Sequence, residues 1–261
     1  NKEMAQFAVG HRIEDLKERY QGYDRVQEHL DAIQQDVIDH VEAFTGQGQA
    51  QGKQQLQMGD EETGPLEATL HRYQANVLVD NSEQEGAPVV YEDLPTHQHL
   101  VGRVEHRAQQ GALLTDFTLI KPGALHRANG GYLLLDARKV LMQPFAWESL
   151  KRALYAREAR IESIEQMYAL LSTVSLEPEP APLDVKIILL GDRFLYYLLS
   201  EYDPDFRELF KVQADFEEDL PRSEENNQLY ARLIGTIAQQ EGLTLFDRGA
   251  VARVIEHGSR L

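Results

Sequence analysis

Apolar residues recur at intervals of three and four positions through the first 45 residues of the chain. This spacing places side chains along one face of an α-helix. Gly22 separates two such stripes, so the pattern predicts a helical hairpin over residues 1–45. The first stripe contains Phe7, Ile13, Leu16 and Tyr20, and the second contains Val26, Leu30, Ile33, Val37, Val41 and Phe44.

Residues 46–65 are rich in Gly and Gln and have no apolar period, which is typical of a linker or a long loop. Gly52-Lys53 resembles the end of a phosphate-binding loop. That motif also needs a Gly five positions earlier and a Ser or Thr after the Lys, where this chain has Gln47 and Gln54. A flexible tether therefore explains the segment better.

Short, continuous apolar runs follow the linker and alternate with helical patterns. Continuous runs are typical of strands that are covered on both faces, as in parallel sheets. The alternation predicts an α/β core over residues 66–220. Its expected strands are 75–80, 88–91, 131–136 and 184–191, and its expected helices are 145–157, 192–201 and 204–210.

The pattern returns to helical spacing for residues 221–261. Leu229, Leu233 and Ile237 mark one helix, and Val251 and Val254 mark another. Ser223, followed by Glu224 and Glu225, forms a helix start signal. Two helices after an α/β core predict a small, separate helical subdomain.

Composition excludes several classes of function. The chain contains no cysteine, which excludes disulfides, thiolate zinc sites and cysteine nucleophiles and fits a reducing cytoplasm. A net charge of −17 disfavours nucleic acid as a partner. No apolar run approaches the ~20 residues that span a bilayer, and the first residues lack a signal-peptide pattern. The chain begins in a helical pattern without Met, which suggests an excised piece.

The apolar run Gly131–Asp136 ends in an acid, as a Walker B strand does. In nucleotide hydrolases such a strand delivers an Asp to the carboxyl edge of a parallel sheet, where it orients Mg²⁺ and its waters. Taken alone, the run is equally typical of any buried strand that ends at a turn.

Longer segments favour the Walker B interpretation over an ordinary buried strand. Residues 121–136, KPGALHRANGGYLLLD, closely resemble the stretch that contains Walker B in B-type Lon proteases. The segments FAWESLKRAL at 145–154, RIE at 160–162 and PLDVKIILLGD at 182–192 resemble the same family. The resemblance covers residues 70–261, and residues 1–45 more loosely resemble the end of that family's helical insertion.

This resemblance implies a partial AAA+ core with a mostly parallel sheet, an N-terminal helical hairpin and a C-terminal helical lid. It implies ATP and Mg²⁺ as cofactors of the complete protein and a homo-hexameric ring. The ring would thread protein substrates into a Ser-Lys peptidase chamber. No phosphate-binding loop and no peptidase pair stand out in the chain, so we expect it to be inactive alone.

Two acids take roles from the resemblance. Asp136 matches the Walker B aspartate and would be the residue that holds Mg²⁺, through water and only with ATP. The next position usually carries a catalytic Glu but here is Ala137, so an AAA+-derived scaffold or adaptor that hydrolyses no ATP is the alternative. Asp192 occupies the position of a polar sensor for the γ-phosphate, and capping of the helix after it is the alternative.

Two further sites also rest on the resemblance. Arg207 lies in the region of the arginine finger, displaced by two positions from the usual site, now Leu209; a surface ion pair with Asp203 or Glu208 is the alternative. Phe117, with Leu119 as a weaker candidate, has the spacing of the aromatic in the substrate-gripping pore loop. Core packing is the alternative for Phe117.

The remaining polar clusters predict no additional chemistry. His97, His99 and His106 do not have a metal-ligand spacing, so we expect surface or capping histidines. His126 precedes an Asn-Gly-Gly turn that it could help to position. The acidic run 215–219 lacks the pattern of a calcium loop and is expected to be solvated.

Overall fold

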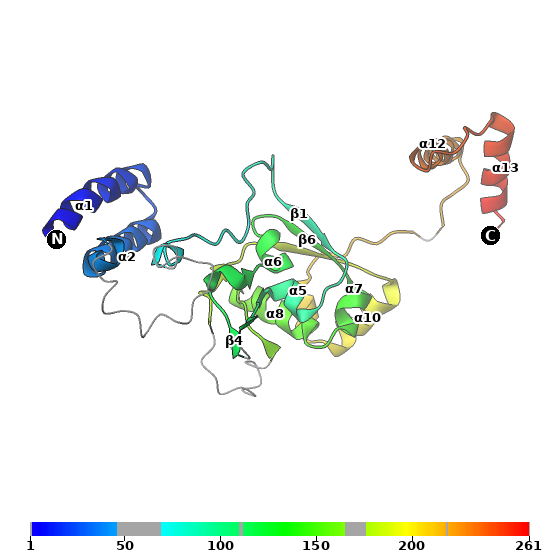
Figure 1. Cartoon of the computed structure of the whole chain (residues 1–261). Helices are drawn as coiled ribbons and strands as arrows, with labels where there is room; N and C mark the ends of the chain where they lie inside the picture. The colour runs from blue at the N-terminus through cyan, green and yellow to red at the C-terminus, as the bar shows by residue number, and fades with distance from the viewer. Residues whose placement is uncertain (1, 46–68, 110–111, 165–175, 218, 261) are drawn as a thin grey trace. The chain divides into compact units, whose positions relative to one another are not determined.

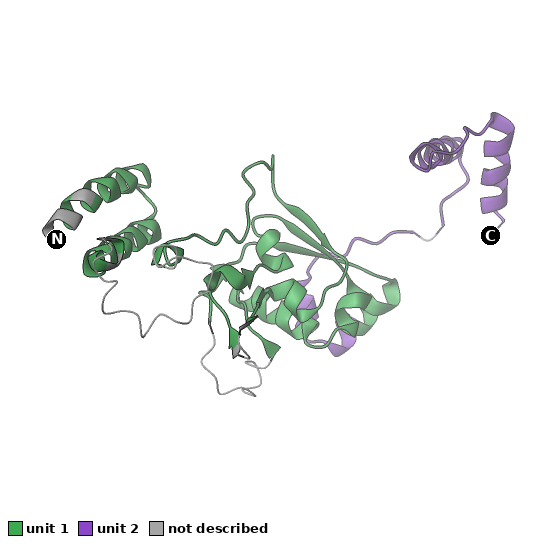
Figure 2. Cartoon of the chain, in the orientation of Figure 1, with its two compact units in different colours: residues 1–198 green, residues 199–261 purple. Residues whose placement is uncertain are grey.

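The computed structural model describes residues 2–45, 69–109, 112–164, 176–217 and 219–260. The predicted linker at 46–65, including Gly52-Lys53, lies outside these residues. The chain divides into two compact units, residues 1–198 and 199–261, with the boundary inside one helix (Figure 2). Each unit is described by itself.

A pair of helices opens the first unit. Helix α1 (Lys2–Arg19) and helix α2 (Asp24–Asp39) are joined by a turn in which Gly22 has φ +91°. A left-handed backbone of this kind suits glycine, which has no Cβ. Ile13 and Leu30 are buried, whereas Phe7 is 87% exposed. The second stripe is not one helix, because α2 ends at Asp39 and α3 (Val41–Thr45) begins after it.

Three parallel strands form the central sheet. Strand β6 (Tyr132–Asp136) lies between β1 (Val89–Glu92) and β9 (Lys186–Leu190), as Figure 1 shows for β1 and β6. These three strands were predicted. The strand expected at 75–80 is wrong, because this segment has no regular structure. The side-chain amide of Asn76 fastens it instead by donating to the carbonyl oxygens of Phe117 (2.8 Å) and Ile120 (3.2 Å).

One face of the sheet forms the core. Leu133 and Leu135 of β6 are fully buried and pack with Val90, Ile187 and Leu189 of the neighbouring strands. Four helices contribute buried side chains to the same cluster. They are α5 (His97–Val101), α6 (Ala124–Arg127), α7 (Ala137–Met142) and α8 (Ala146–Ala156).

The opposite face of the sheet is apolar but exposed. Tyr91 pairs with Leu134, which pairs with Ile188, so these side chains share one face. Tyr91 is 54% exposed and Ile188 is 40% exposed, and Val89 and Leu190 are also exposed. A parallel sheet is normally covered on both faces, so this face differs from the usual arrangement.

The turn Asn129–Gly131 aligns the three strands at their amino ends. The Asn129 side chain accepts from the Asp184 N–H (2.8 Å) and donates to the Pro182 carbonyl (2.9 Å) before β9. Gly130 has φ +82°. A Cβ on Gly131 would lie 2.0 Å from the Pro88 carbonyl oxygen before β1. The sequence Asn-Gly-Gly is therefore required by close backbone packing.

Short antiparallel pairs complete the first unit. Strands β2 (Arg103–Val104) and β5 (Ile120–Lys121) pair, as do β3 (Arg107–Gln109) and β4 (Ala112–Leu114). A 3₁₀ turn, η2 (Phe117–Leu119), lies between β4 and β5. Strands β7 (Glu158–Ala159) and β8 (Ala181–Pro182) form a third pair.

The boundary between units falls within α10 (Arg193–Tyr202). The second unit then contains α11 (Phe206–Leu209), α12 (Glu224–Gln240) and α13 (Arg248–Gly258). The Ser223 hydroxyl accepts from the Asn226 N–H (3.1 Å) and so caps α12, as predicted. None of the helices in the described parts of the chain has both the length and the apolar character needed to cross a membrane.

Candidate functional site at the carboxyl edge of the sheet

Asp136 ends the central strand β6 and begins the following helix. Its Oδ1 accepts a hydrogen bond from the Lys139 N–H (2.9 Å), so the side chain is the N-cap of α7. Such a cap satisfies one of the unpaired N–H groups of the first helical turn. The structure thus places Asp136 at the carboxyl edge of a parallel sheet, where ligands of α/β proteins bind.

Asp192 lies two residues beyond Leu190, which pairs with Asp136 in the adjacent strand. Its Oδ1 accepts from the Leu195 N–H (2.9 Å) in the first turn of α10. The helix-capping alternative therefore describes what this carboxylate does in the structure. The two acids follow neighbouring strands at the same edge, as the resemblance requires, and both cap the next helix.

Ala137, in place of the expected Glu, is 5% exposed. It faces the end of β9, because a Cβ built on Gly191 would lie 3.2 Å from the Ala137 Cβ. Position 137 therefore lies beside the residue that precedes Asp192. A methyl group there fills the space without offering a base.

A lysine partly neutralises this edge. Lys139 Nζ lies 2.5 Å from Asp93 Oδ1, just after β1. This hydrogen bond lowers the pKa of Asp93 and raises the pKa of Lys139, and Asp136 contributes a smaller electrostatic effect to Lys139. The lysine side chain thus supplies positive charge close to the position expected for a cation.

The described residues hold no group of three or more acidic or histidine side chains that could bind a metal ion by itself. The expectation that Asp136 would hold Mg²⁺ through water and together with nucleotide phosphates stays a prediction. A single carboxylate fits such outer-sphere binding. When bound, Mg²⁺ would neutralise charge on the phosphates, and this chain's part would be to orient the hydrated ion.

Glu92 and Arg127 form a contact that the sequence did not predict. Arg127 Nη2 lies 2.7 Å from Glu92 Oε2, and the Leu94 N–H donates to Glu92 Oε1 (3.2 Å). Glu92 pairs with Leu135 and so lies on the covered face of the sheet. Its carboxylate therefore fastens α6 to β1.

His126 stands beside this contact on α6. Burial and, secondarily, the Arg127 charge lower the pKa of His126. The neutral imidazole accepts a hydrogen bond from the Gly123 N–H through Nδ1 (3.4 Å). The side chain thus supports the start of α6, whereas the nearby turn is fixed by Asn129.

Phe117 and Leu119, the pore-loop candidates, are both half-buried in η2. The ring of Phe117 lies 5.5 Å from the ring of His71, centroid to centroid. The Asn76 amide also holds the Phe117 carbonyl. Phe117 is therefore held at one side, and its pore-loop role stays a prediction.

Arg207 lies on α11 in the second unit and is exposed. The aromatic rings of Phe206 and Phe210 stack at a centroid distance of 5.2 Å, and Phe206 is buried. This packing fixes the short helix that carries Arg207. An exposed arginine is available for contact with another molecule, and its role as a finger stays a prediction.

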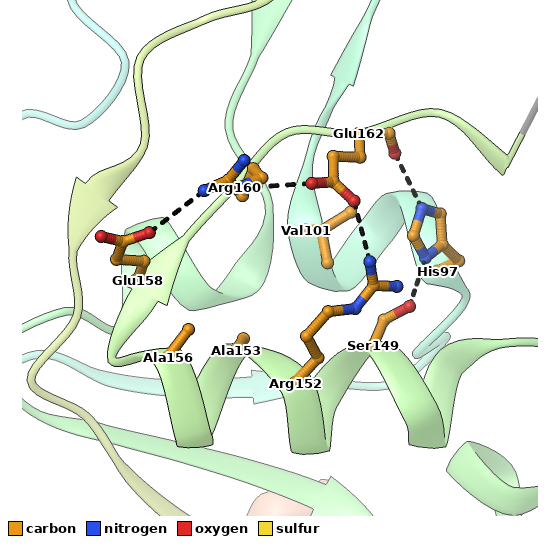
Figure 3. A pocket seen from close by; sticks show the side chains of 9 residues that line it. All are labelled: His97, Val101, Ser149, Arg152, Ala153, Ala156, Glu158, Arg160 and Glu162. Atoms are coloured by element: carbon orange, nitrogen blue, oxygen red, sulfur yellow. Dashed lines mark hydrogen bonds and ion pairs between the residues drawn. The ribbon is translucent and has the colours of Figure 1, made fainter. Parts of the chain in front are cut away.

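A pocket of about 250 Å³ is lined by residues of α5, α8 and the segment 158–162, and none of the candidate site residues lines it (Figure 3). The expectation that His97 is a surface or capping residue is wrong, because it is 3% exposed. Its Nε2 is 2.8 Å from the Glu162 carbonyl and its Nδ1 is 2.8 Å from the Ser149 hydroxyl. A carbonyl only accepts, so Nε2 carries the proton and Ser149 donates to Nδ1.

Ion pairs line the mouth of this pocket. Glu162 contacts Arg152 (3.0 Å) and Arg160 (3.4 Å), and Arg160 also contacts Glu158 (3.4 Å). Positive and negative side chains are balanced, as Figure 3 shows. The arrangement links the segment 160–162 to α5 and α8 and has the features of a structural tie. The hydroxyl that caps α5 belongs to Thr96, which accepts from the His99 backbone N–H (3.2 Å), and His99 Nδ1 lies 2.8 Å from the Leu94 carbonyl oxygen.

The sequence model of the LonB-like AAA domain matches residues 85–217, just over half of the chain. The chain belongs to this family. The matched range contains β1, β6 and β9 together with Asp136, Asp192 and Arg207.

Two individual proteins are similar to this LonB-like AAA chain. The "Putative Lon protease homolog" of Escherichia coli (strain K12) is 31% identical over 105 residues, which are 40% of this chain and 17% of that protein. The chain thus spans about a sixth of that relative. The crystal structure of NtrX from Brucella abortus has a TM-score of 0.42 and 21% identity, covering 64% of this chain and 35% of NtrX.

Proposed function

We propose that this chain is the Walker B and sensor part of the ATPase module of a Lon-like protease, with Asp136 and Asp192 facing the nucleotide. One observation carries the proposal: the two acids follow adjacent parallel strands, β6 and β9, at the same edge of the sheet. Membership of the LonB-like AAA family supports nucleotide as the ligand.

In the complete protein this module would couple ATP binding and hydrolysis to the movement of a polypeptide substrate. Asp136 would orient hydrated Mg²⁺, and Asp192 would contact the γ-phosphate region. Arg207 would act on the nucleotide of a neighbouring copy in a homo-hexameric ring, because a guanidinium neutralises charge on a transferred phosphoryl group. Each acid can cap its helix and also face the nucleotide, since the cap uses one carboxylate oxygen and leaves the other available.

The exposed apolar face of the sheet supports a larger assembly. Tyr91, Ile188 and Leu190 expose surface that a parallel sheet normally buries. We propose that other protein covers this face in the complete molecule. Because the described residues offer no cradle for phosphates, we expect the chain alone to hydrolyse no ATP.

The test uses the complete gene product. We expect its sequence to contain a phosphate-binding loop before this region and a Ser-Lys peptidase after it. Purified protein should then hydrolyse ATP and degrade casein when ATP is present. Tight nucleotide binding without turnover would favour the alternative proposal, a scaffold with an AAA+-derived fold. Ala137 supports this alternative, because no base stands at that position.

A further inference from the structure

Lys139 connects the first turn of α7 with the end of the neighbouring strand β1. Its backbone N–H donates to Asp136 Oδ1 (2.9 Å), and its Nζ lies 2.5 Å from Oδ1 of Asp93, one residue beyond β1. The two contacts hold both ends of one residue. The ammonium group of Lys139 is therefore placed at the carboxyl edge of the sheet.

The carboxyl edge carries an acid after each of its three strands. Asp93 follows β1, Asp136 ends β6 and Asp192 follows β9. A nucleotide is an anion, so these carboxylates repel its phosphates unless positive charge lies between them. Lys139 supplies such a charge: Asp93 is the main cause that raises the pKa of Lys139, and Asp136 adds a smaller effect.

The contact between Lys139 and Asp93 can be exchanged at little cost. The two side chains are 44% and 74% exposed. Ion pairs in such positions contribute little to stability, because water screens the charges and both side chains lose freedom. A triphosphate carries more negative charge than one carboxylate, so it attracts the ammonium group more strongly.

The lysine side chain can make this exchange without moving its helix. Its four-carbon stem is flexible and ends in a compact charge with three donors. The Asp136 cap holds the Lys139 backbone at the start of α7 throughout. Only the end of the side chain would have to turn from Asp93 to a phosphate oxygen in front of Asp136.

We propose that Lys139 binds the terminal phosphates of the nucleotide, and that Asp93 holds this lysine at the edge while the nucleotide is absent. The proposal rests on the proposed function, since it names a further residue that contacts the nucleotide there. Asp93 and the phosphates compete for one ammonium group. Removing the lysine and removing the aspartate should therefore change ATP affinity in opposite directions.

Isothermal titration calorimetry of the complete protein with ATP and with AMP tests this competition. Lys139→Met keeps the side-chain length and removes its charge, so it should weaken ATP binding at least about tenfold. AMP lacks the terminal phosphates, so its affinity should change less than about twofold, which also shows that the variant is folded. Asp93→Asn should strengthen ATP binding about 1.5- to fivefold, because it removes the competing ion pair.

Lys186→Met is the matched control. It removes the same charge from the amino end of β9, where Lys186 Nζ lies 5.5 Å from the centroid of the Tyr132 ring. ATP affinity should change less than about twofold in this variant. Lys139→Arg keeps the charge and should retain most of the affinity for ATP.

Three results would overturn the inference: unchanged ATP affinity in Lys139→Met, an equal loss in Lys186→Met, or an equal loss in Asp93→Asn. The last result would mean that the ion pair only supports α7. If Asp136→Asn lowers ATP turnover while Lys139→Met binds ATP normally, the inference fails and the proposed function stands. If the unchanged complete protein binds no ATP, the proposed function itself fails.

Discussion

Asp136 and Asp192 each perform a local structural task at the position where a nucleotide site is proposed. Each carboxylate accepts an N–H of the helix that follows its strand. At the scale of single residues, the sequence predicted where these acids lie, because an apolar strand followed by an acid is a short-range pattern. It did not predict Glu92–Arg127 or the buried His97, because both depend on residues 35 to 65 positions apart.

The turn before β6 gives the first prediction. Gly131→Ala should destabilise the chain by about 2–3 kcal/mol, since overpacking against fixed backbone costs this much, and the added Cβ would meet the Pro88 carbonyl oxygen at 2.0 Å. Urea unfolding followed by circular dichroism measures it. Gly235→Ala in α12, where the Cβ meets nothing within 4 Å, is the control. Gly235→Ala should stabilise the chain by about 0.5–1 kcal/mol. Equal changes in unfolding free energy for Gly131→Ala and Gly235→Ala would contradict the close packing at Gly131.

The buried hydroxyls give the second prediction. Ser149→Ala removes the donor to His97 Nδ1 and leaves a buried nitrogen unsatisfied, so it should cost about 1–3 kcal/mol. Ser200→Ala is the matched change, because its buried Oγ has no hydrogen-bond partner among the described residues. Removing the Ser200 hydroxyl should leave the free energy of unfolding unchanged or raise it slightly. The urea midpoints of the two variants measure this difference. A larger loss of stability in Ser200→Ala than in Ser149→Ala would contradict the hydrogen bond assigned to Ser149 and His97.

At the scale of elements, helices and strands with strong local patterns were predicted within two residues of their ends. β6, β9, α8, α10 and the Ser223 cap belong to this group. The strand predicted at 75–80 was wrong, because an apolar run of strand length forms a strand only when a neighbouring strand pairs with it. The small strands β2, β3, β4 and β5 were missed because each is only two or three residues long, which is too short to produce an alternating pattern.

The hydrogen bond from the Tyr73 hydroxyl to Asp36 of α2 gives the third prediction. Burial and the hydrogen bond to Asp36 raise the pKa of Tyr73 to about 12. The folded chain favours the neutral phenol, so this contribution to stability is complete below the unfolded pKa of about 10 and is lost as the pH rises toward 12. NMR titration of ¹³C-labelled tyrosine should show the Tyr73 resonance titrating near pH 12.

The same titration of Asp36→Asn should move that resonance to lower pH, because a negative neighbour is removed. Part of the upward shift should remain, since burial is its largest cause. A Tyr73 resonance that titrates near 10 in the unchanged chain would contradict the contact.

At the scale of the whole molecule, the family and the fold class were predicted from the segment 121–136, and the LonB-like AAA match confirms the family. The uncovered sheet face was not predicted, because continuous apolar runs such as 184–191 are typical of strands with two covered faces. The runs are apolar on both sides, yet Ile187 and Leu189 pack against the core while Ile188 and Leu190 are exposed.

This uncovered face gives the fourth prediction. The purified chain should bind a dye for apolar surface such as ANS, and Tyr91→Thr with Ile188→Thr should reduce the fluorescence by at least about half. Leu133→Ala on the covered face is the control. It should instead cost about 2–5 kcal/mol of folding stability, because Leu133 is fully buried. Unchanged dye binding in the double variant would mean that another surface binds the dye.

The central claim is that nucleotide meets the carboxyl edge of β6 and β9. The most direct test is ATP turnover of the complete protein with Asp136→Asn, compared with Asp184→Asn at the amino end of β9. The account predicts a loss of about 100-fold at Asp136, as expected when a group that supports phosphoryl-transfer charge is removed, and near-normal turnover at Asp184. Equal turnover in the two variants would contradict it.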